Sequence, residues 1–403
     1  ELDEKKREID GLRRKLEIEA ALERIRSLTM VMKRSDDLSD IILTVYKELR
    51  KLDIALTRTL IWLFSENPDM FEVWVADTEA DTTPFVMKQE VEHPYHKRMF
   101  DVWKKRKSKW VYINEGEGKK DLDDYLFTKT AAAAVPEEVK DGIRSVNRIV
   151  NSFSFHNFGC LQADGAEELS EENFEIMYRF AKEFDLAYTR FLDLQKAEAQ
   201  AKEAEIEAAL ERVRARSMAM QDSIELMDVV EVLYDQFDSL GIADDMTDIE
   251  ICLIDEDTGV YTVWQTHESL TGDEGNLELP ITASTQLKKE FAAWEKTPPE
   301  QRSDLFFNHV LESGELKNFL SKLKMLEGWE HVLDVFKKNK IKRWVTCNAY
   351  FQYGMLTYQN VEKKGSEIDE LLPRFAKVFE QTYTRFLDLK KAEAQAREAQ
   401  IEA

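Results

Sequence analysis

Apolar positions recur every three or four residues over the first part of the chain and again over its centre. The first 52 residues are almost free of Gly and Pro, and one apolar face comprises Ala21, Leu22, Ile25, Leu28 and Met32. This spacing predicts a single long amphipathic helix. No Gly or Pro lies between Phe174 and Leu240 either. We therefore expect the helix that leaves one globular part to run without a break into the helix that enters the next.

Short β-branched and aromatic runs separated by turn residues predict β-hairpins. Thr59–Ser65 and Met70–Ala76 form one such pair, and Ile249–Ile254 and Val260–Gln265 form the other. Each hairpin is followed by a helix, a variable helical insert and a closing strand pair, and then by helix again. The helices are predicted near Pro94–Lys105 and Ser284–Trp294, and the strand pairs near Asn147–Gln162 and Lys342–Gln359.

The chain contains an internal repeat. The segment Glu17–Leu38 (EIEAALERIRSLTMVMKRSDDL) matches Glu205–Leu226 (EIEAALERVRARSMAMQDSIEL), and a 30-residue run from Arg179 matches a second one from Arg374. The repeating unit is therefore about 190 residues long, and a repeat of this kind fixes the architecture before any single residue is considered.

Two copies of one α+β domain follow from this repeat, each an antiparallel sheet covered by helices. We place the first domain at 36–186 and the second at 223–381. The flanking helices are an N-terminal helix at 1–35, a connecting coiled-coil helix at 187–222 and a C-terminal helix at 382–403.

The connecting helix carries two apolar seams. The first has the alternating three and four spacing of a two-helix coiled coil and comprises Leu194, Ala197, Ala201, Ala204 and Ala208. The second lies round the helix from the first and comprises Ile206, Leu210, Val213, Ser217 and Met220. Two interpretations of the second seam stay open: a change of coiled-coil phase that transmits rotation, or simple packing on the domain's own sheet.

Aromatic residues are the candidates for a ligand pocket between sheet and helices. In the first copy they are Trp62, Trp74, Phe100, Trp103, Phe155 and Phe158, and in the second Trp264, Phe291, Trp294, Tyr350 and Tyr353. Four pairs recur at matched places: Trp74 with Trp264, Phe100 with Phe291, Trp103 with Trp294, and Phe158 with Tyr353. The alternative is that they form only the core.

Charge and composition restrict the function. The formal net charge of −23 disfavours binding to nucleic acid, which needs clustered cations. No apolar run is long enough for a membrane span, so we expect a cytoplasmic module. The six histidines are scattered and the three cysteines lie singly in strand-like stretches. This pattern predicts neither a metal site nor a catalytic site, and we expect no enzymatic activity.

The run from Arg179 to Met220, RFAKEFDLAYTRFLDLQKAEAQAKEAEIEAALERVRARSMAM, resembles the tandem GAF-like sensor domains of bacterial signalling proteins, notably of the Bacteroidetes type. In that family such domains precede histidine kinase or adenylate/guanylate cyclase outputs, bind small molecules such as cyclic nucleotides or tetrapyrroles, and dimerise through flanking helices. The sequence has neither the NKFDE motif of cyclic-nucleotide binders nor a cysteine in a bilin-attachment context, so the resemblance supplies no binding residue.

The resemblance implies a sensory and dimerisation module that forms a parallel coiled-coil homodimer and drives an effector domain outside this chain. The ligand that such a module would bind is left open. The alternative is a structural helical spacer whose degenerate domains bind nothing.

Overall fold

The computed structural model describes residues 2–34, 37–52, 54, 58–64, 70–75, 85–90, 92–265, 276–363, 365 and 367–402. The chain divides into two compact units, unit 1 (Glu1–Gln200) and unit 2 (Ala201–Ala403). We describe each unit by itself.

Unit 1 contains a six-stranded antiparallel sheet. Its strands are β1 (Arg58–Phe64), β2 (Met70–Val75), β3 (Phe85–Glu90), β4 (Lys109–Glu115), β5 (Arg148–His156) and β6 (Gly159–Gly165), in the order β3-β2-β1-β6-β5-β4. Its helices are α1 (Leu2–Val31), α2 (Leu38–Lys51), α3 (Pro94–Lys104), α4 (Gly116–Lys129), α5 (Glu137–Ser145), the short η2 (Ala131–Ala134) and the first part of α6 (Glu171–Met218).

Unit 2 repeats this topology. Its strands are β7 (Asp248–Asp255), β8 (Val260–Gln265), β9 (Leu277–Pro280), β10 (Phe306–Glu312), β11 (Arg343–Phe351) and β12 (Gly354–Asn360), in the order β10-β11-β12-β7-β8-β9. Besides the end of α6, the helices are α7 (Leu226–Ser239), α8 (Thr285–Lys296), α9 (Ser313–Leu323), α10 (Glu330–Lys338), α11 (Ile368–Glu402), and the short η3 (Ser223–Glu225), η5 (Ile281–Ala283) and η6 (Pro299–Asp304).

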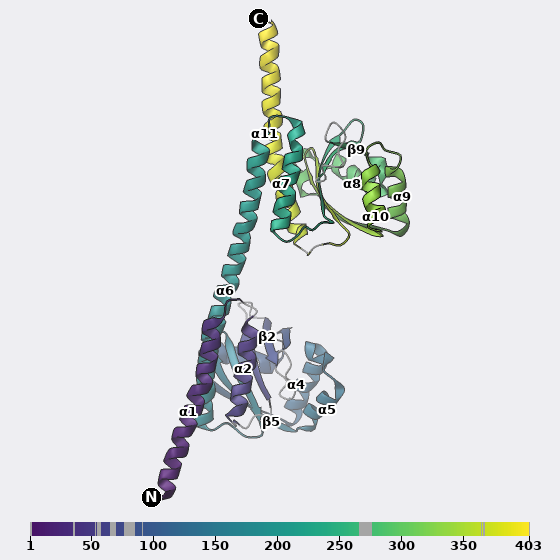
Figure 1. Ribbon diagram of the computed structural model, residues 1–403. Coiled ribbons are helices and arrows are strands. Elements are labelled where there is room, and N and C mark those ends of the chain that lie inside the picture. The colour runs from purple at the N-terminus through teal and green to yellow at the C-terminus, as the bar shows by residue number, and fades with distance from the viewer. Residues whose placement is uncertain are drawn as a thin grey trace. The chain divides into compact units, whose positions relative to one another are not determined.

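Each sheet is covered on both faces. We call the face under α1, α2 and α6 in unit 1, and under α6, α7 and α11 in unit 2, the bundle face. The opposite face, under α3 and α4 or under α8, α9 and α10, is the insert face (Figure 1). Strand alternation separates the two cores: Ile61 and Leu63 point to the bundle face, whereas Leu60 and Trp62 point to the insert face.

The predicted α+β class and both predicted hairpins are confirmed, because β1 pairs with β2 and β7 with β8, antiparallel in each case. The closing pairs β5 with β6 and β11 with β12 are confirmed as well. The sequence missed both edge strands of each sheet. These are β3 and β9, which follow the hairpins, and β4 and β10, which begin the insert that it assigned to helices alone.

The prediction of one helix over the first 52 residues is wrong. The helix ends at Val31 and a second begins at Leu38. The carboxylate of Asp37 accepts hydrogen bonds from the backbone N–H groups of Lys33 (2.8 Å) and Arg34 (3.1 Å). Arg190 of α6 donates to the carbonyl oxygen of Met32 at 2.8 Å. The break lets α2 fold back and bury its own apolar face in the core.

The predicted continuous helix from Phe174 to Leu240 is also interrupted. Helix α6 ends at Met218, and Asp222 and Glu225 form a capping box that starts the next helical segment. The pattern Asp-x-x-Glu is a recognised helix start. Without Gly or Pro to mark it, this polar signal was the only indication of the break.

Two matched glycines allow each closing hairpin to approach its neighbouring strand. A Cβ atom on Gly159 would lie 1.8 Å from the carbonyl oxygen of Trp62, and one on Gly354 would lie 1.9 Å from that of Cys252. In each case the obstructing atom belongs to the backbone of β1 or β7, which a side-chain rotation cannot move.

We predict that Gly159→Ala lowers the free energy of unfolding of unit 1 by about 3 kcal/mol, because β6 must separate from β1 to admit the methyl group. Urea denaturation measures the effect. The control is Gly142→Ala in α5, where nothing lies within 4 Å of the added atom. That variant should be as stable as the wild type or up to about 1 kcal/mol more stable. Equal stability of the two variants would contradict the prediction.

Candidate functional site

The aromatic residues predicted to line one pocket lie on opposite faces of each sheet. In unit 1, Trp74 and Phe158 pack against the bundle-face core, whereas the insert face holds Trp62, Phe100, Trp103 and Phe155. In unit 2, Trp264 and Tyr353 pack on the bundle face, and the insert face holds Phe291, Trp294 and Tyr350. The structure therefore does not bring either set together.

The insert face of unit 1 carries a buried hydrogen-bond network that the sequence analysis missed. The indole N–H of Trp62 donates to Oε1 of Gln162 at 2.6 Å, and the amide nitrogen of Gln162 donates to Oδ1 of Asp164 at 2.6 Å. Asn151 donates to the same carboxylate oxygen at 2.5 Å. Asp164 has no exposed surface. Burying a carboxylate is costly unless such donors satisfy it.

His96 on α3 lies beside this network. Its ring is 4.9 Å from Phe71 and 5.6 Å from Trp62, measured between centroids. Neither ring nitrogen has a hydrogen-bond partner among the described residues. Burial, with a smaller contribution from nearby His93, lowers the pKa of His96 to about 3. The ring is therefore neutral when folded, and its two polar atoms are unsatisfied within an aromatic shell.

Unit 2 places a different polar cluster on the matching face. Glu290 of α8 has no exposed surface and accepts hydrogen bonds from Asn348 (2.7 Å), Tyr350 (3.1 Å) and Gln286 (3.1 Å). The hydroxyl groups of Tyr350 and Tyr261 are 3.4 Å apart, and burial raises the pKa of both phenols. Gln286 lies one turn before Glu290 on α8, whereas the donors Asn348 and Tyr350 reach it only when α8 packs on the folded sheet.

A second buried carboxyl group lies on the same face of unit 2. Glu250 accepts a hydrogen bond from the amide of Gln359 at 3.0 Å, and Gln359 in turn accepts one from the indole of Trp344 at 2.6 Å. Burial first, and the charge of Asp248 second, raise the pKa of Glu250 well above its ordinary value. Burial likewise raises the pKa of the adjacent Cys252 thiol.

The missed polar residues share one sequence signal. Those on strands, such as Gln162, Asp164 and Asn348, alternate with residues of the opposite face inside otherwise apolar strands. A polar residue at a position whose parity points inward indicates a buried network. Which alternate residues of a strand point inward is known only when the position of that strand in the sheet is known.

The tip of each closing hairpin links the two faces, through contacts that we call the tip joint. On the insert face, the indole of Trp103 donates to the carbonyl oxygen of His156 at 3.0 Å, and Trp294 donates to that of Phe351 at 3.0 Å. On the bundle face, the next backbone N–H donates to a carboxylate of the helix that follows the closing hairpin. This helix, α6 in unit 1 and α11 in unit 2, we call the exit helix. These bonds join Asn157 to Asp185 and Gln352 to Glu380, each at 2.8 Å.

Edge-to-face aromatic contacts strengthen the joint on the exit helix. Tyr188 contacts Phe158 with a centroid distance of 4.9 Å, and Tyr383 contacts Tyr353 at 5.6 Å. In unit 2, Arg302 adds a hydrogen bond to the carbonyl oxygen of Gln352 at 3.1 Å while its guanidinium lies 3.7 Å from the ring centre of Trp294. Both units therefore hold the hairpin tip from two sides.

In unit 1 a buried histidine also contacts the joint. Nδ1 of His156 lies 3.2 Å from Oδ1 of Asp185, and burial lowers the pKa of the ring although the carboxylate opposes this. Unit 2 has Phe351 at the corresponding place, so the histidine is specific to unit 1.

The two predicted seams of α6 have different environments. Along the first seam Leu194 is half-buried, and Ala197, Ala201, Ala204 and Ala208 are exposed. Along the second, Ile206, Leu210, Val213 and Met220 are buried in the core of unit 2, and Ser217 is buried as well. Side chains packed in this way are not available to a second copy of the chain.

The exposed first part of α1 bears an apolar stripe that the sequence analysis did not single out. Ile9, Leu12 and Leu16 are 63%, 56% and 70% exposed. Their spacing of three and then four residues is that of a coiled-coil seam.

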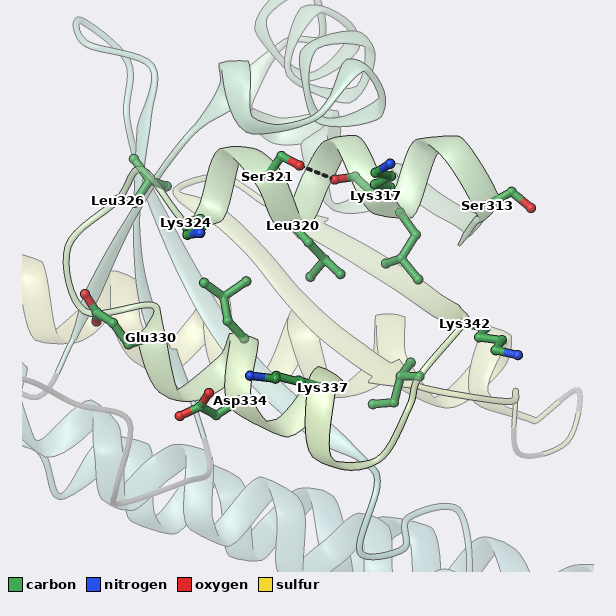
Figure 2. Close-up of a pocket in the computed structure, with 13 residues that line it drawn as sticks. Ser313, Lys317, Leu320, Ser321, Lys324, Leu326, Glu330, Asp334, Lys337 and Lys342 are labelled. Carbon is green, nitrogen blue, oxygen red and sulfur yellow. Dashed lines mark hydrogen bonds between the residues drawn. The ribbon is translucent and has the colours of Figure 1, made fainter.

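A groove with a lysine-bearing rim lies between α9 and α10 of unit 2 (Figure 2). It has a volume of about 860 Å³. None of the aromatic residues predicted from the sequence lines it.

In the described part of the chain, no group of three or more His, Cys, Asp or Glu residues is placed to hold a metal ion. Cys160, Cys252 and Cys347 are free and buried. Within the same residues, no helix combines the length and the apolar character needed to cross a bilayer.

No model of a known protein family matches the sequence, and no curated protein matches it. A bacteriophytochrome from the photosynthetic bacterium R. palustris is similar in structure, with 11% identity and a TM-score of 0.32 over 85% of this chain. The chain spans 61% of that protein. The phycoerythrobilin-bound GAF domain of a cyanobacterial phytochrome matches with 14% identity and a TM-score of 0.25, over 45% of this chain and 97% of that domain. At these TM-scores neither likeness decides family or ligand.

We predict that the stability of unit 1 falls as the pH is lowered from about 6.5 towards 3, in part because of His96. Over that range the unfolded chain binds a proton at this ring and the folded chain does not. His96→Phe should reduce this dependence and raise stability at neutral pH by on the order of 1–3 kcal/mol, because the unsatisfied nitrogens are removed. Hydrogen exchange of the β5 and β6 amides measures unit 1 alone. An unchanged pH dependence in the variant would refute the assignment.

Proposed function

We propose that this chain is a non-catalytic sensory and dimerisation module, in which GAF-like units pass a ligand-dependent or conformational state through their exit helices to a downstream effector outside the chain. The observation that carries this proposal is the tip joint. It connects the insert face, the bundle face and the exit helix in both units with hydrogen bonds at matched positions.

The joint has the properties that transmission requires. A ligand changes an equilibrium only if it interacts differently with two states, so a sensor needs a contact that reports the state of one layer to another. Trp103 and Trp294 occupy the covering helices of the insert face, whereas Asp185 and Glu380 lie on the exit helices. In each unit, the C=O and the N–H of a single peptide group at the hairpin tip form the two hydrogen bonds.

The buried polar clusters support ligand sensing over the alternative of an inert spacer. A spacer gains nothing from unsatisfied polar atoms in its core, and each such atom in a folded protein calls for an explanation. Both nitrogens of His96, the side-chain oxygen of Asn348 and both polar atoms of Gln265 are buried without partners among the described residues. Unpartnered buried atoms also lie on the bundle face, at Nε1 of Trp74 and Nε2 of His156, so these atoms favour ligand sensing without assigning it to one face.

The absence of catalysis is supported by the state of the reactive groups. Burial raises the pKa of the Cys160 and Cys252 thiols, which disfavours the nucleophilic thiolate. Burial also keeps His96 and His156 neutral and away from solvent. These groups fit structural or binding roles.

Dimerisation is supported by the exposed apolar positions along the helices. They are Ile9, Leu12 and Leu16 on α1, and Ala197, Ala201, Ala204 and Ala208 on α6. Single exposed apolar residues are common, but a stripe with heptad spacing gains free energy by pairing.

We predict that the chain is a dimer at micromolar concentration and that Leu12→Asp with Leu16→Asp raises its dissociation constant at least about tenfold, since two charges would enter the seam. Light scattering coupled to gel filtration gives the mass. The control is Val139→Asp on α5, an exposed apolar position outside these helices. A monomeric wild type would overturn the dimer.

The direction of pairing has its own test. In a parallel dimer the two copies of residue 9 meet, so Ile9→Cys should form an intermolecular disulfide under mild oxidation. The three native cysteines are buried and should not contribute. Failure to cross-link in a chain that remains dimeric would indicate another orientation.

We predict that Trp294→Phe increases hydrogen exchange at the tip residues 352–354 and along α11 near Tyr383, because the tip loses its hydrogen bond to α8. Trp329→Phe is the matched control. It removes a comparable bond, from a buried indole to the carbonyl oxygen of Glu278 at 2.9 Å, on the same face but far from the tip in sequence. If both variants or neither increased exchange in α11, the joint would not be the link.

A further inference from the structure

The groove between α9 and α10 has an apolar floor and a charged rim. Its floor is formed by Leu316, Leu320, Leu326, Leu333 and Ile341. Leu316 is buried and the other four are half-buried. The rim carries the exposed side chains of Lys317, Lys324, Lys337, Lys342, Glu330 and Asp334. A volume of about 860 Å³ is within the range of sites for small molecules.

The charge of the rim is opposite to that of the chain as a whole. Residues 313–343 contain eight Lys and Arg against four Asp and Glu, whereas the whole chain has a net charge of −23. None of the four rim lysines forms an ion pair with another described residue. Four unpaired ammonium groups beside an apolar floor favour a ligand that is both anionic and apolar.

The cations are unevenly distributed along the groove. Figure 2 shows Ser313 and Lys342 at one end and Leu326, Lys324 and Glu330 at the other. Both carboxylates of the rim, Glu330 and Asp334, lie on the first part of α10 and towards the second end. The end near Lys342 therefore has positive charge without a competing anion.

We propose that this groove binds a fatty acid as its carboxylate, with the headgroup at the Lys342 end and the acyl chain along the leucines. A compact carboxylate is matched by lysine ammonium groups, which act as point charges. A protein helix, about 10–12 Å across, would need a longer groove than these helices of 11 and 9 residues provide. A membrane surface is flat and does not fill a concave site.

Unit 1 provides an internal comparison. In the corresponding insert, Lys119 is buried and paired with Asp123, and Lys140 is buried and paired with Glu137 at 2.7 Å. Residues 116–145 contain five Lys and Arg against seven Asp and Glu. In unit 1, therefore, Lys119 and Lys140 are engaged in ion pairs within the insert. The proposed site belongs to unit 2 alone.

Isothermal titration of the full chain with dodecanoate, kept below its micelle concentration, tests the proposal. We expect one molecule bound per chain. Octanoate should bind several-fold more weakly, because each methylene removed from water contributes to affinity. Dodecyltrimethylammonium, with the same tail and the opposite charge, should not bind. The test does not depend on dimerisation, so it fails or succeeds independently of the proposed module.

Charge-reversal variants locate the site. Lys317→Glu, Lys337→Glu and Lys342→Glu combined should weaken dodecanoate binding at least about tenfold. The matched control reverses three exposed lysines outside the groove, Lys288, Lys289 and Lys338, and should bind within about twofold of the wild type.

Three results would overturn the proposal. They are an absence of dodecanoate binding to the wild type, equal loss of affinity in the two triple variants, and binding of anionic phosphatidylglycerol vesicles without binding of dodecanoate. The last result would indicate a membrane surface as the partner.

Discussion

The structure depends on the close approach of each closing hairpin to its neighbouring strand and to the exit helix. Gly159 and Gly354 leave no space for a side chain there, so the hairpin tip is fixed against β1 or β7. From that position its carbonyl group accepts a hydrogen bond from the insert face, and the following N–H donates one to the bundle face. Two layers that share no core thus meet at one peptide group.

The two units keep this joint and differ around it. His156 beside Asp185 is replaced by Phe351, and the network centred on Asp164 in unit 1 is replaced by one centred on Glu290 in unit 2. A buried carboxylate requires its own set of hydrogen-bond donors. Replacing one residue of such a network at a time therefore lowers the stability of the fold. Under the proposed function, a shared joint with different interiors is what two units that respond to different molecules would require.

Local pattern explains which parts of the fold were predictable. The strands of the hairpins were predictable from their β-branched and aromatic composition and from the turn residues between them. The repeat added a second copy of each element for comparison. The edge strands β4 and β10 were missed because Lys109–Glu115 and Phe306–Glu312 mix charged and apolar residues without clean alternation. The aromatic candidates were assigned to one pocket because Trp74 and Phe100 are both large, whereas register places them on opposite faces.

The sequence by itself determined the repeat, the helical character of the connecting segments, the hairpins and the closing strand pairs, since these follow from spacing between near neighbours. Only the tertiary structure decided where the helices break, which face each strand residue occupies, and that Ile206, Leu210, Val213 and Met220 belong to a core instead of a dimer seam. It also decided that unpaired lysines surround an apolar groove. These outcomes depend on burial of surface between distant segments, a free energy that no local pattern records.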